Sequence, residues 1–206
     1  MTTERPGGIA ASIGPRLRRL RTSSGRSLAS VAEAVGISSS ALSQIETGVM
    51  QPSVNRLIEI VAVLGAPVSA IFDDHDVLQP TALAAGTSEP IPGVHVSVPD
   101  EASAPTLRQG VVYRRLTPVA LDGIDLFETT YPPGTSSSID GAMLVHAGYE
   151  MGSVVVGTLL FEFTEGAVEL GVGGSLAFWA TRPHRVVNPS QATTAVAIWL
   201  TLRNGL

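Results

Sequence analysis

The fold of the N-terminal part of this chain is decided by residues 27–48, which read SLASVAEAVGISSSALSQIETG. Ser27 is a typical N-cap for a helix that begins at Leu28, because its hydroxyl can accept a hydrogen bond from a free backbone N–H of the first turn. Gly36 suits the left-handed position after the last turn of that helix. Ser38 can cap a second helix, which ends near Gly48.

Two helices that meet in so tight a turn need a small residue at their contact and an apolar residue that closes the pair. Ala32 and Leu42 stand at these positions, four residues before and six residues after the glycine of the bend. The stretch therefore predicts a helix-turn-helix.

Helical periodicity continues on both sides of this hairpin. Upstream, a helix is expected to begin near Ser12, with Pro15 in its first turn. Downstream, Pro52 and Ser53 are expected to open a fourth helix, and a fifth short turn runs from Pro67 to Phe72. The prediction is five short helices, with these apolar positions in the first and fourth: Ile13, Leu17, Leu20, Leu57, Ile58, Val61 and Leu64.

The charge of the chain is divided unevenly. The net charge of −5 and the pI of about 5.3, taken alone, argue against a nucleic-acid partner. Residues 1–72, however, carry seven Arg against four Glu, a net charge of +3, whereas residues 73–206 carry six Arg against fourteen acids, a net charge of −8. The basic third of the chain is therefore the part expected to approach phosphate.

The remaining sequence divides into a linker and a β-rich part. Residues 73–105 are rich in proline and predict a linker, in which VHVSV (94–98) could form one edge strand. From residue 106 the apolar pattern has period two, typical of an all-β barrel or sandwich. The expected strands lie in VVYRRL, IDLFETTY, YEMGSVVVG, TLLFEF, AVEL, SLAFWA and TAVAIWLTL.

Composition excludes several classes of protein. With 206 residues, 44% of them hydrophobic, the chain can bury a real core. It has no cysteine, hence no disulfide, thiolate nucleophile or Cys-ligated metal. No apolar run reaches the ~18–20 residues of a membrane span, and no secretory signal is evident, so a cytoplasmic protein without membrane contact is expected.

Residues 13–72 resemble the phage-repressor-like (lambda-repressor-like) helix-turn-helix family, often called XRE. The run LSQIETG…PS…L is the most specific part of the match. The resemblance implies a five-helix DNA-binding domain whose helix from Ser38 enters the major groove. It also implies that Arg21 is a structural partner of Glu46 rather than a DNA contact.

The side chains expected to touch DNA are polar and lie at helix starts or on the exposed face of the helix after Ser38. Gln44 can pair with adenine through two hydrogen bonds, whereas serines bond phosphates as well as bases. Surface capping alone is the alternative for the serines, and a solvated helix face is the alternative for the Arg run 16–21. The expected DNA contacts are Arg26, Ser27, Ser38, Ser39, Ser40, Ser43, Gln44, Ser53 and Asn55.

The β-rich part, residues 106–206, resembles the cupin family. The segments PPGTSSSIDGAMLVHAGYE (132–150) and RPHRVVN (182–188) match its two short motifs. The resemblance implies an all-β double-stranded β-helix barrel whose metal ligands are His146, Glu150 and His184. The family's first histidine is replaced by Leu144, so the ligand set is incomplete.

Two histidines and one carboxylate can bind one divalent metal such as Zn, Mn, Fe or Ni. The alternative is that these groups hydrogen-bond to each other or to an organic effector inside the barrel. The residues expected to line an effector pocket are Phe127, Leu144, His146, Tyr149, Glu150, Phe161, Phe163, Trp179, His184 and Trp199.

Taken together, the sequence predicts a transcription regulator, and the resemblance to the helix-turn-helix family favours a repressor. It is expected to bind a palindromic DNA operator as a homodimer under control of a small molecule in the barrel. The expected domains are 1–72 (core 13–72) for DNA, 73–105 as the linker that carries the change in spacing, and 106–206 as the sensor. The alternatives are a cupin metalloenzyme of oxygenase or isomerase type fused to a DNA-binding domain, and a barrel that serves only to dimerise.

Overall fold

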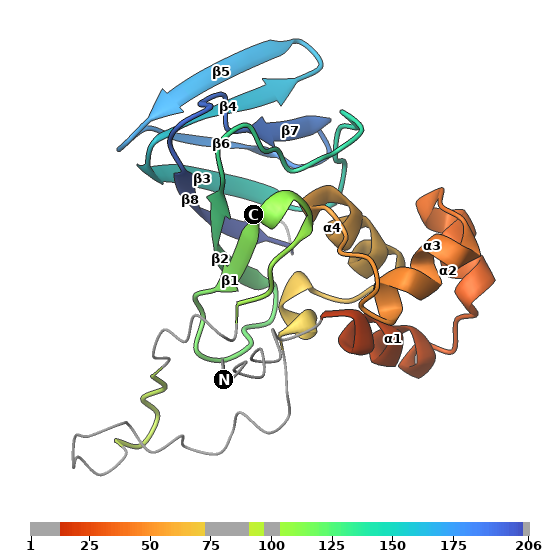
Figure 1. Cartoon of the computed structure of the whole chain (residues 1–206). Coiled ribbons are helices and arrows are strands. Elements are labelled where there is room, and N and C mark those ends of the chain that lie inside the picture. Colours follow the sequence, from red (N-terminus) through yellow and green to blue (C-terminus); the bar gives the residue numbers. More distant parts are fainter. Residues whose placement is uncertain (1–12, 73–90, 97–103, 204–206) are drawn as a thin grey trace, which may run out of the picture.

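The computed structural model describes residues 13–72, 91–96 and 104–203. A small helical domain lies beside a β domain made of two sheets (Figure 1). Most of the predicted linker, residues 73–90 and 97–103, lies outside the described residues. The described piece 91–96 contains no strand, so the expected edge strand over 94–98 is not formed at residues 94–96.

The helical domain holds four α-helices within residues 13–72, and their starts are capped as expected. The hydroxyls of Ser27, Ser38 and Ser53 each accept a hydrogen bond from a backbone N–H of the first turn. Gly36 follows the second helix with φ 71°, in the left-handed conformation that the sequence predicts. The helices are α1 (Ile13–Ser23), α2 (Leu28–Val35), α3 (Ser39–Glu46) and α4 (Val54–Val63).

The expected fifth helix is instead a single turn of 3-10 helix, η1 (Val68–Ile71). Pro67 directly precedes it, and the turn spans only four residues. Such a segment is too short to form the repeated hydrogen bonds of an α-helix. The correction is therefore four α-helices and one 3-10 turn.

Close packing of α1 on α3 depends on Gly14. A Cβ atom built on this glycine would lie 2.4 Å from the carbonyl oxygen of Ile45 and 2.8 Å from that of Glu46. Ala32 and Leu42 are fully buried, as the helix-turn-helix pattern requires. The helical core therefore needs a glycine at position 14, where α1 meets α3, and a buried apolar side chain at Leu42.

All seven apolar runs of period two lie on strands, and one further strand, β7, is present. β7 has only four residues and carries Arg185 between Pro183 and Asn188, so its sequence has no clear apolar alternation. The strands are β1 (Val112–Arg115), β2 (Ile124–Tyr131), β3 (Tyr149–Val156), β4 (Thr158–Phe163), β5 (Gly166–Gly171), β6 (Ser175–Trp179), β7 (His184–Val187) and β8 (Ala195–Leu202).

The strands form two antiparallel sheets. The larger has the order β1-β2-β8-β3-β6 and the smaller the order β5-β4-β7. No strand ladder closes the two sheets into one barrel within the described residues, which corrects the expectation of a closed barrel. The edge strands are β1 and β6 in the larger sheet and β5 and β7 in the smaller one.

The two domains are packed directly against each other. Phe72, which follows η1, lies with its ring centre 5.4 Å from that of Phe127 in β2 and 6.1 Å from that of Tyr113 in β1. The helical domain therefore shares an aromatic cluster with one end of the β domain.

We expect Gly14→Ala to destabilise the helical domain by about 2 kcal/mol or more, because backbone carbonyl groups cannot move aside as a flexible side chain can. Denaturant unfolding followed by far-UV circular dichroism measures the loss. Ala29→Val in α2, at an exposed position, is the control and should cost only ~0.5 kcal/mol in helix propensity. Equal effects of the two substitutions would contradict the tight α1–α3 contact.

Candidate functional site

The helix expected to read DNA is presented to solvent. Ser39, Ser40 and Gln44 on α3 are exposed and Ser43 is half-buried, whereas Leu42 on the opposite face is buried. Ser38 is exposed and caps α3, and its hydroxyl accepts from the N–H of Ala41 at 3.1 Å. Exposed polar side chains at the start of a helix can reach base edges and phosphates.

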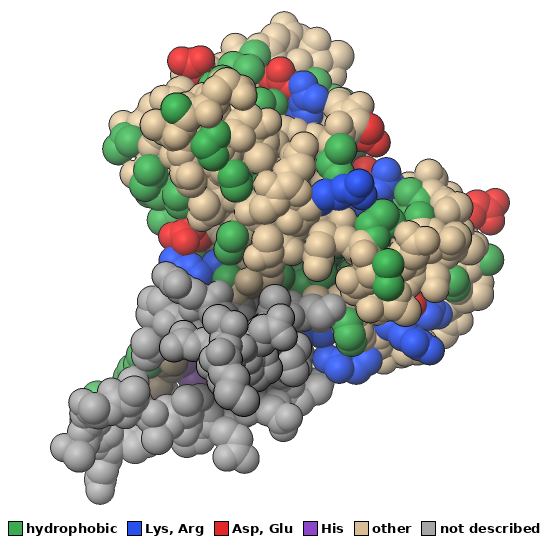
Figure 2. Space-filling model, in the orientation of Figure 1, with side chains coloured by type: hydrophobic (Ala, Val, Ile, Leu, Met, Phe, Trp, Pro, Cys, Tyr) green, Lys and Arg blue, Asp and Glu red, His purple; other side chains and the backbone are tan. Residues whose placement is uncertain are grey.

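Basic side chains are exposed on another helix of the same domain. Arg18 and Arg19 of α1 are exposed, and Figure 2 shows arginines along the lower margin of the helical domain, over α1. Part of the positive charge that the sequence assigns to this domain, including Arg18 and Arg19, is therefore exposed on its surface.

The predicted pair of Arg21 and Glu46 is confirmed. The guanidinium of Arg21 donates to both carboxylate oxygens of Glu46, at 2.6 and 2.9 Å, and a third bond reaches the carbonyl of Arg26 at 3.1 Å. Glu46 is only 5% exposed. The bond to Glu46 raises the pKa of Arg21 more than its burial lowers it. This pair joins α1 to the end of α3 and is structural.

Two of the expected DNA contacts have other partners. The side chain of Asn55 is buried and its amide donates to the carbonyl of Ala142 in the β domain at 3.0 Å, which corrects its assignment as a phosphate contact. The guanidinium of Arg26 donates to the carbonyl of Val63 at the end of α4. Ser27 is exposed and Ser53 is half-buried, and both serve as caps.

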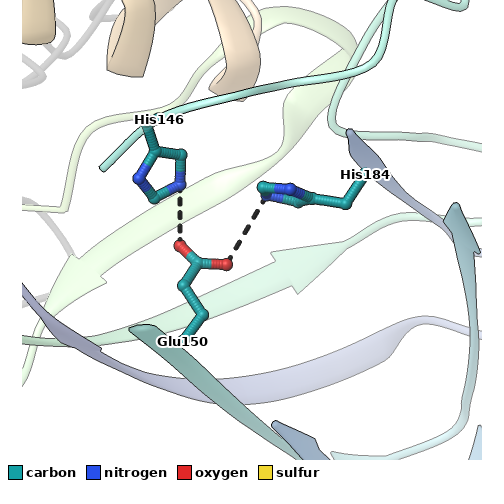
Figure 3. Close-up of side chains that lie close together, drawn as sticks. All are labelled: His146, Glu150 and His184. Carbon is teal, nitrogen blue, oxygen red and sulfur yellow. Dashed lines mark ion pairs between the residues drawn. The ribbon is translucent and has the colours of Figure 1, made fainter. Parts of the chain in front are cut away.

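In the β domain, three side chains from separate elements converge (Figure 3). Glu150 of β3 lies between the two imidazole rings: Nε2 of His146 is 3.0 Å from Oε1, and Nε2 of His184 is 3.6 Å from Oε2. One ligand atom from each of the three residues lies within 4.8 Å of the others. The structure therefore brings together the three residues that the cupin motifs selected.

Backbone carbonyls orient both rings. Nδ1 of His146 lies 2.9 Å from the carbonyl oxygen of Ala147, and Nδ1 of His184 lies 2.8 Å from that of Arg182. If Nδ1 carries the proton and donates it, the lone pair of each Nε2 points toward Glu150. This is the tautomer in which histidine binds a metal through Nε2.

The two histidines differ in their electrostatic surroundings. Burial lowers the pKa of His146, but the Glu150 carboxylate and the carbonyl of Ala147 outweigh burial, so the net pKa is raised. Burial also lowers the pKa of His184, and there the more distant carboxylate does not compensate, so the net pKa is lowered. The carboxylate thus favours the charged form of both rings, but only at His146 does this effect outweigh burial.

Leu144 occupies the place of the missing histidine. It is 3% exposed, and its N–H and carbonyl pair with the carbonyl and N–H of His184 at 2.8 and 3.0 Å. Val145 is 54% exposed, so Leu144 and His146 point inward together, as period two predicts.

Most residues expected to line a pocket are inside the β domain. Phe161 and Trp199 are buried with ring centres 5.7 Å apart, and Phe127 is buried in the cluster with Phe72 and Tyr113. Phe163 is half-buried and packs edge-on against Phe178, with ring centres 5.1 Å apart.

Tyr149 and Trp179 are the exceptions. They pair across β3 and β6 with ring centres 5.0 Å apart, on the side of the sheet opposite to Glu150, and Trp179 is 50% exposed. Strand alternation places Tyr149 outside if Glu150 is inside. Both assignments to the pocket are therefore corrected.

Sequence reasoning missed Phe178 and Thr201. The ring centre of Phe178 lies 4.9 Å from that of His184, and the hydroxyl of Thr201 donates to Glu150 at 3.4 Å. Both face Glu150 in the registers of β6 and β8 with β3. Only the pairing of strands, which the sequence does not contain, could have revealed them.

Asn188, the last residue of the second motif, has a structural role. Its amide donates to the carbonyls of Tyr131, Pro132 and Thr193 at 2.9, 3.0 and 2.9 Å. It is 1% exposed. These bonds hold the ends of β2, β7 and β8 together near the site.

Comparison with known proteins agrees with this architecture. Residues 12–71 match the family of helix-turn-helix domains and residues 127–201 match the family of cupin domains. The chain therefore matches one family in each of its two domains, in the order that the sequence predicts.

Two relatives extend over both domains. The chain is 27% identical over 177 residues to the HTH-type transcriptional regulator PuuR of Escherichia coli (strain K12), covering 86% of this chain and 88% of that protein. The crystal structure of an HTH_3 family transcriptional regulator from Vibrio cholerae is 27% identical, covers 94% of this chain and 97% of its own, and superposes with a TM-score of 0.63.

We expect the two histidines to titrate on opposite sides of the ordinary value of about 6.5, His146 above it and His184 below it. The stability that protonated His146 contributes is complete below pH ~6.5 and is lost as the pH rises through its raised pKa. His184 contributes the opposite slope, because stability is lost as the pH falls from ~6.5 through its lowered pKa. Imidazole NMR signals recorded against pH measure both values.

Glu150→Gln supplies the decisive comparison. It removes the charge that favours protonated His146 while the burial of that ring remains, so the pKa of His146 should fall. Glu165→Gln is the control, because Glu165 is an exposed surface residue paired with Arg182 at 3.6 Å. A His146 titration that is unchanged by Glu150→Gln would contradict the assigned role of the carboxylate.

Proposed function

We propose that this protein is a sequence-specific DNA-binding transcription regulator whose cupin domain senses a small ligand. The observation that carries the proposal is α3, which presents Ser39, Ser40 and Gln44 to solvent in the domain with the basic net charge. Both full-length relatives are described as transcriptional regulators, which favours regulation over a cupin enzyme. Such a protein acts in the compartment that holds the genome, so a cytoplasmic location belongs to the proposal. Within the described ranges, no helix has the length and apolar character needed to cross a membrane.

The proposed boundaries are a DNA-binding domain over residues 1–72, a linker over 73–105 and a sensor domain over 106–206. The contact of Phe72 with Tyr113 and Phe127 supports a boundary immediately after η1. It also means that the linker does not separate the two domains in space.

We further propose that the protein is a homodimer that reads a palindromic operator. The outward face of the larger sheet supports this, because it is largely apolar. Met151, Val155 and Trp179 are 39%, 39% and 50% exposed on this side, and a hollow of about 400 Å³ lies among residues of β3, β6 and β8. Exposed apolar surface of this kind is typical of an interface, and the same face on two copies can meet about a two-fold axis.

The ligand site is proposed to hold one divalent metal on His146, Glu150 and His184. Nε2 of His146 is buried and makes no hydrogen bond of normal geometry, although it lies 3.0 Å from a carboxylate oxygen. A lone pair facing a carboxylate at this distance is repulsive unless a proton or a cation lies between them. Metal bonds of about 2.0–2.2 Å to neighbouring ligands require ligand atoms roughly 3–4 Å apart, close to the distances present. A bound metal would supply a positive charge and open positions for an organic effector.

The DNA-binding proposal is tested by sequencing the genomic fragments that the protein retains at physiological salt. A recovered palindrome gives the operator, and Gln44→Ala should then relax preference at one base pair of each half-site by roughly 1–3 kcal/mol. The control is Gln191→Ala, the same change at an exposed position of the β domain, which should leave the preference unchanged. Retention without any sequence preference would contradict the proposal.

The metal proposal is tested by calorimetric titration of Zn²⁺ or Mn²⁺ at several pH values. We expect one equivalent to bind, with protons released, and affinity to fall as the pH falls, because His146 with its raised pKa binds a proton in competition with the metal. His184→Gln should abolish binding, whereas His95→Gln, at an exposed residue outside the cluster, should not. Leu144→His adds a fourth ligand and should tighten binding. Equal binding by the His184→Gln variant and the wild type would contradict the site.

A further inference from the structure

The helical domain is attached to the β domain at the start of α4. The backbone N–H of Asn55 donates to the carbonyl of Ser137, and its side-chain amide donates to the carbonyl of Ala142, both at 3.0 Å. The backbone N–H of Arg108 donates to the carbonyl of Pro52 at 2.9 Å. Asn55 is 4% exposed. These are directional contacts between domains that the sequence predicts to be joined by a linker.

The partner of α4 is the segment that leads to the His–Glu site. Residues 137–146, which we call the coupling segment, contain both acceptors of Asn55 and end at His146. Only three residues separate Ala142 from His146. If the His146 ring moves, the backbone can therefore carry that movement over a short distance to the acceptors of Asn55.

β7, which carries His184, also holds the coupling segment. The N–H of Ser137 donates to the carbonyl of Val186 at 2.9 Å, and the hydroxyl of Ser137 accepts from the N–H of Val186 at 3.2 Å. Further along, Leu144 pairs with His184 through two backbone hydrogen bonds. Both histidines of the site are thus tied to the segment, one by the chain and one by hydrogen bonds.

A second attachment lies at η1. The N–H of Ser69 donates to the carboxylate of Asp125 at 3.3 Å, and Asp125, 1% exposed, lies 3.2 Å from Nε of Arg203. Phe72 packs in the cluster with Tyr113 and Phe127. None of these residues belongs to the coupling segment, so this attachment is independent of it and can serve as a pivot.

From α4 the connection reaches the helix-turn-helix. Arg56 donates to the carbonyl of Val35, the last residue of α2, at 2.7 Å, and lies 4.0 Å from Asp140 of the coupling segment. A hollow of about 260 Å³ separates Ala41 and Ile45 of α3 from Ile139 and Asp140. α4 is therefore held to the hairpin by a hydrogen bond, while α3 has open space on the side that faces the β domain.

We infer that the coupling segment transmits occupation of the His146–Glu150–His184 site to α4, and through α4 to the orientation of the α2–α3 hairpin. The inference deepens the proposed function and rests on it for the identity of the two ends. His146, Glu150 and His184 would hold a bound cation, and drawing these side chains together would shift both attachments of the coupling segment to the site. Asn55 follows its two acceptors, and the helical domain turns about the contact at η1. Ligand control then depends on this direct contact rather than on the linker.

The test is amide NMR of the full chain with Zn²⁺ as the probe. At one equivalent we expect shifted signals for the amides of residues 144–150 and also for the backbone and side-chain amides of Asn55. Hydrogen exchange of the Asn55 backbone amide should change at least about threefold. Changes confined to residues 144–150, with Asn55 unaltered, overturn the inference while leaving the metal site intact.

A second arm does not depend on metal binding. Glu150→Gln removes the charge between the two histidines, and we expect the signals of Asn55 to change together with those of residues 144–150. Glu165→Gln is the matched control and should leave Asn55 unaltered. If the Glu150→Gln variant shows changes around the site but none at Asn55, the inference fails even where zinc does not bind.

A third arm separates coupling from DNA binding. With the recovered operator, the ratio of the dissociation constants with and without Zn²⁺ is compared for the wild type and for Asn55→Ala. We expect a ratio of several-fold in the wild type and close to one in the variant, whatever its basal affinity. Gln51→Ala, an exposed neighbour of α4, should keep the wild-type ratio. Specific DNA binding with equal zinc response in the wild type and the Asn55→Ala variant overturns coupling alone, whereas absence of specific DNA binding overturns the proposed function.

Discussion

A buried amide must have hydrogen-bond partners, and those of Asn55 lie in the other domain. The Ser53 cap sets where α4 begins, and the partners of Asn55 fix how the start of α4 sits on the β domain. If the partners were lost, a polar side chain and a backbone N–H would remain buried without compensation, at a cost of about 1–3 kcal/mol each. The docked arrangement is therefore the one in which both domains satisfy their polar groups.

Within the β domain, Glu150 has a comparable role. It carries one negative charge and faces two imidazoles at unequal distances, so it can fully favour the charged form of only the nearer one. The backbone carbonyls of Ala147 and Arg182 hold both rings so that their Nε2 atoms face it. Because orientation comes from the backbone, the group keeps its shape although Leu144 stands where the family has a further histidine.

Local features of this fold could be predicted from the sequence. The caps Ser27, Ser38 and Ser53 and the left-handed Gly36 depend on neighbours within a few residues, and all four are present. The salt bridge between Arg21 and Glu46 and the convergence of His146, Glu150 and His184 follow from resemblance to known families. Features that depend on the pairing of distant segments were not predictable from residue patterns.

The errors have the same origin. Asn55 has the sequence character of a helix start that could bind phosphate, and only the β domain shows that it is buried. Residue type alone favours Trp179 over Phe178 as a pocket residue. Phe178 is the residue opposite Glu150 in the register of β6 on β3, and this register cannot be read from the sequence of one strand. The four residues of β7 show no clear alternation, so the sequence does not predict this strand. The expected fifth helix is a 3-10 turn of only four residues.

If two copies pair as proposed, the packing of Phe72 and Asn55 against the β domain also limits which DNA the dimer can accept. One turn of B-DNA takes about 10–10.5 base pairs, so a single inserted base pair rotates one half-site by roughly 34° relative to the other. A DNA-binding domain joined only by a flexible linker could follow that rotation at little cost. In the proposed dimer, the same rotation would require breaking the hydrogen bonds of Asn55 and the aromatic contact of Phe72. The docked domains would then fix the distance between the two halves of the operator.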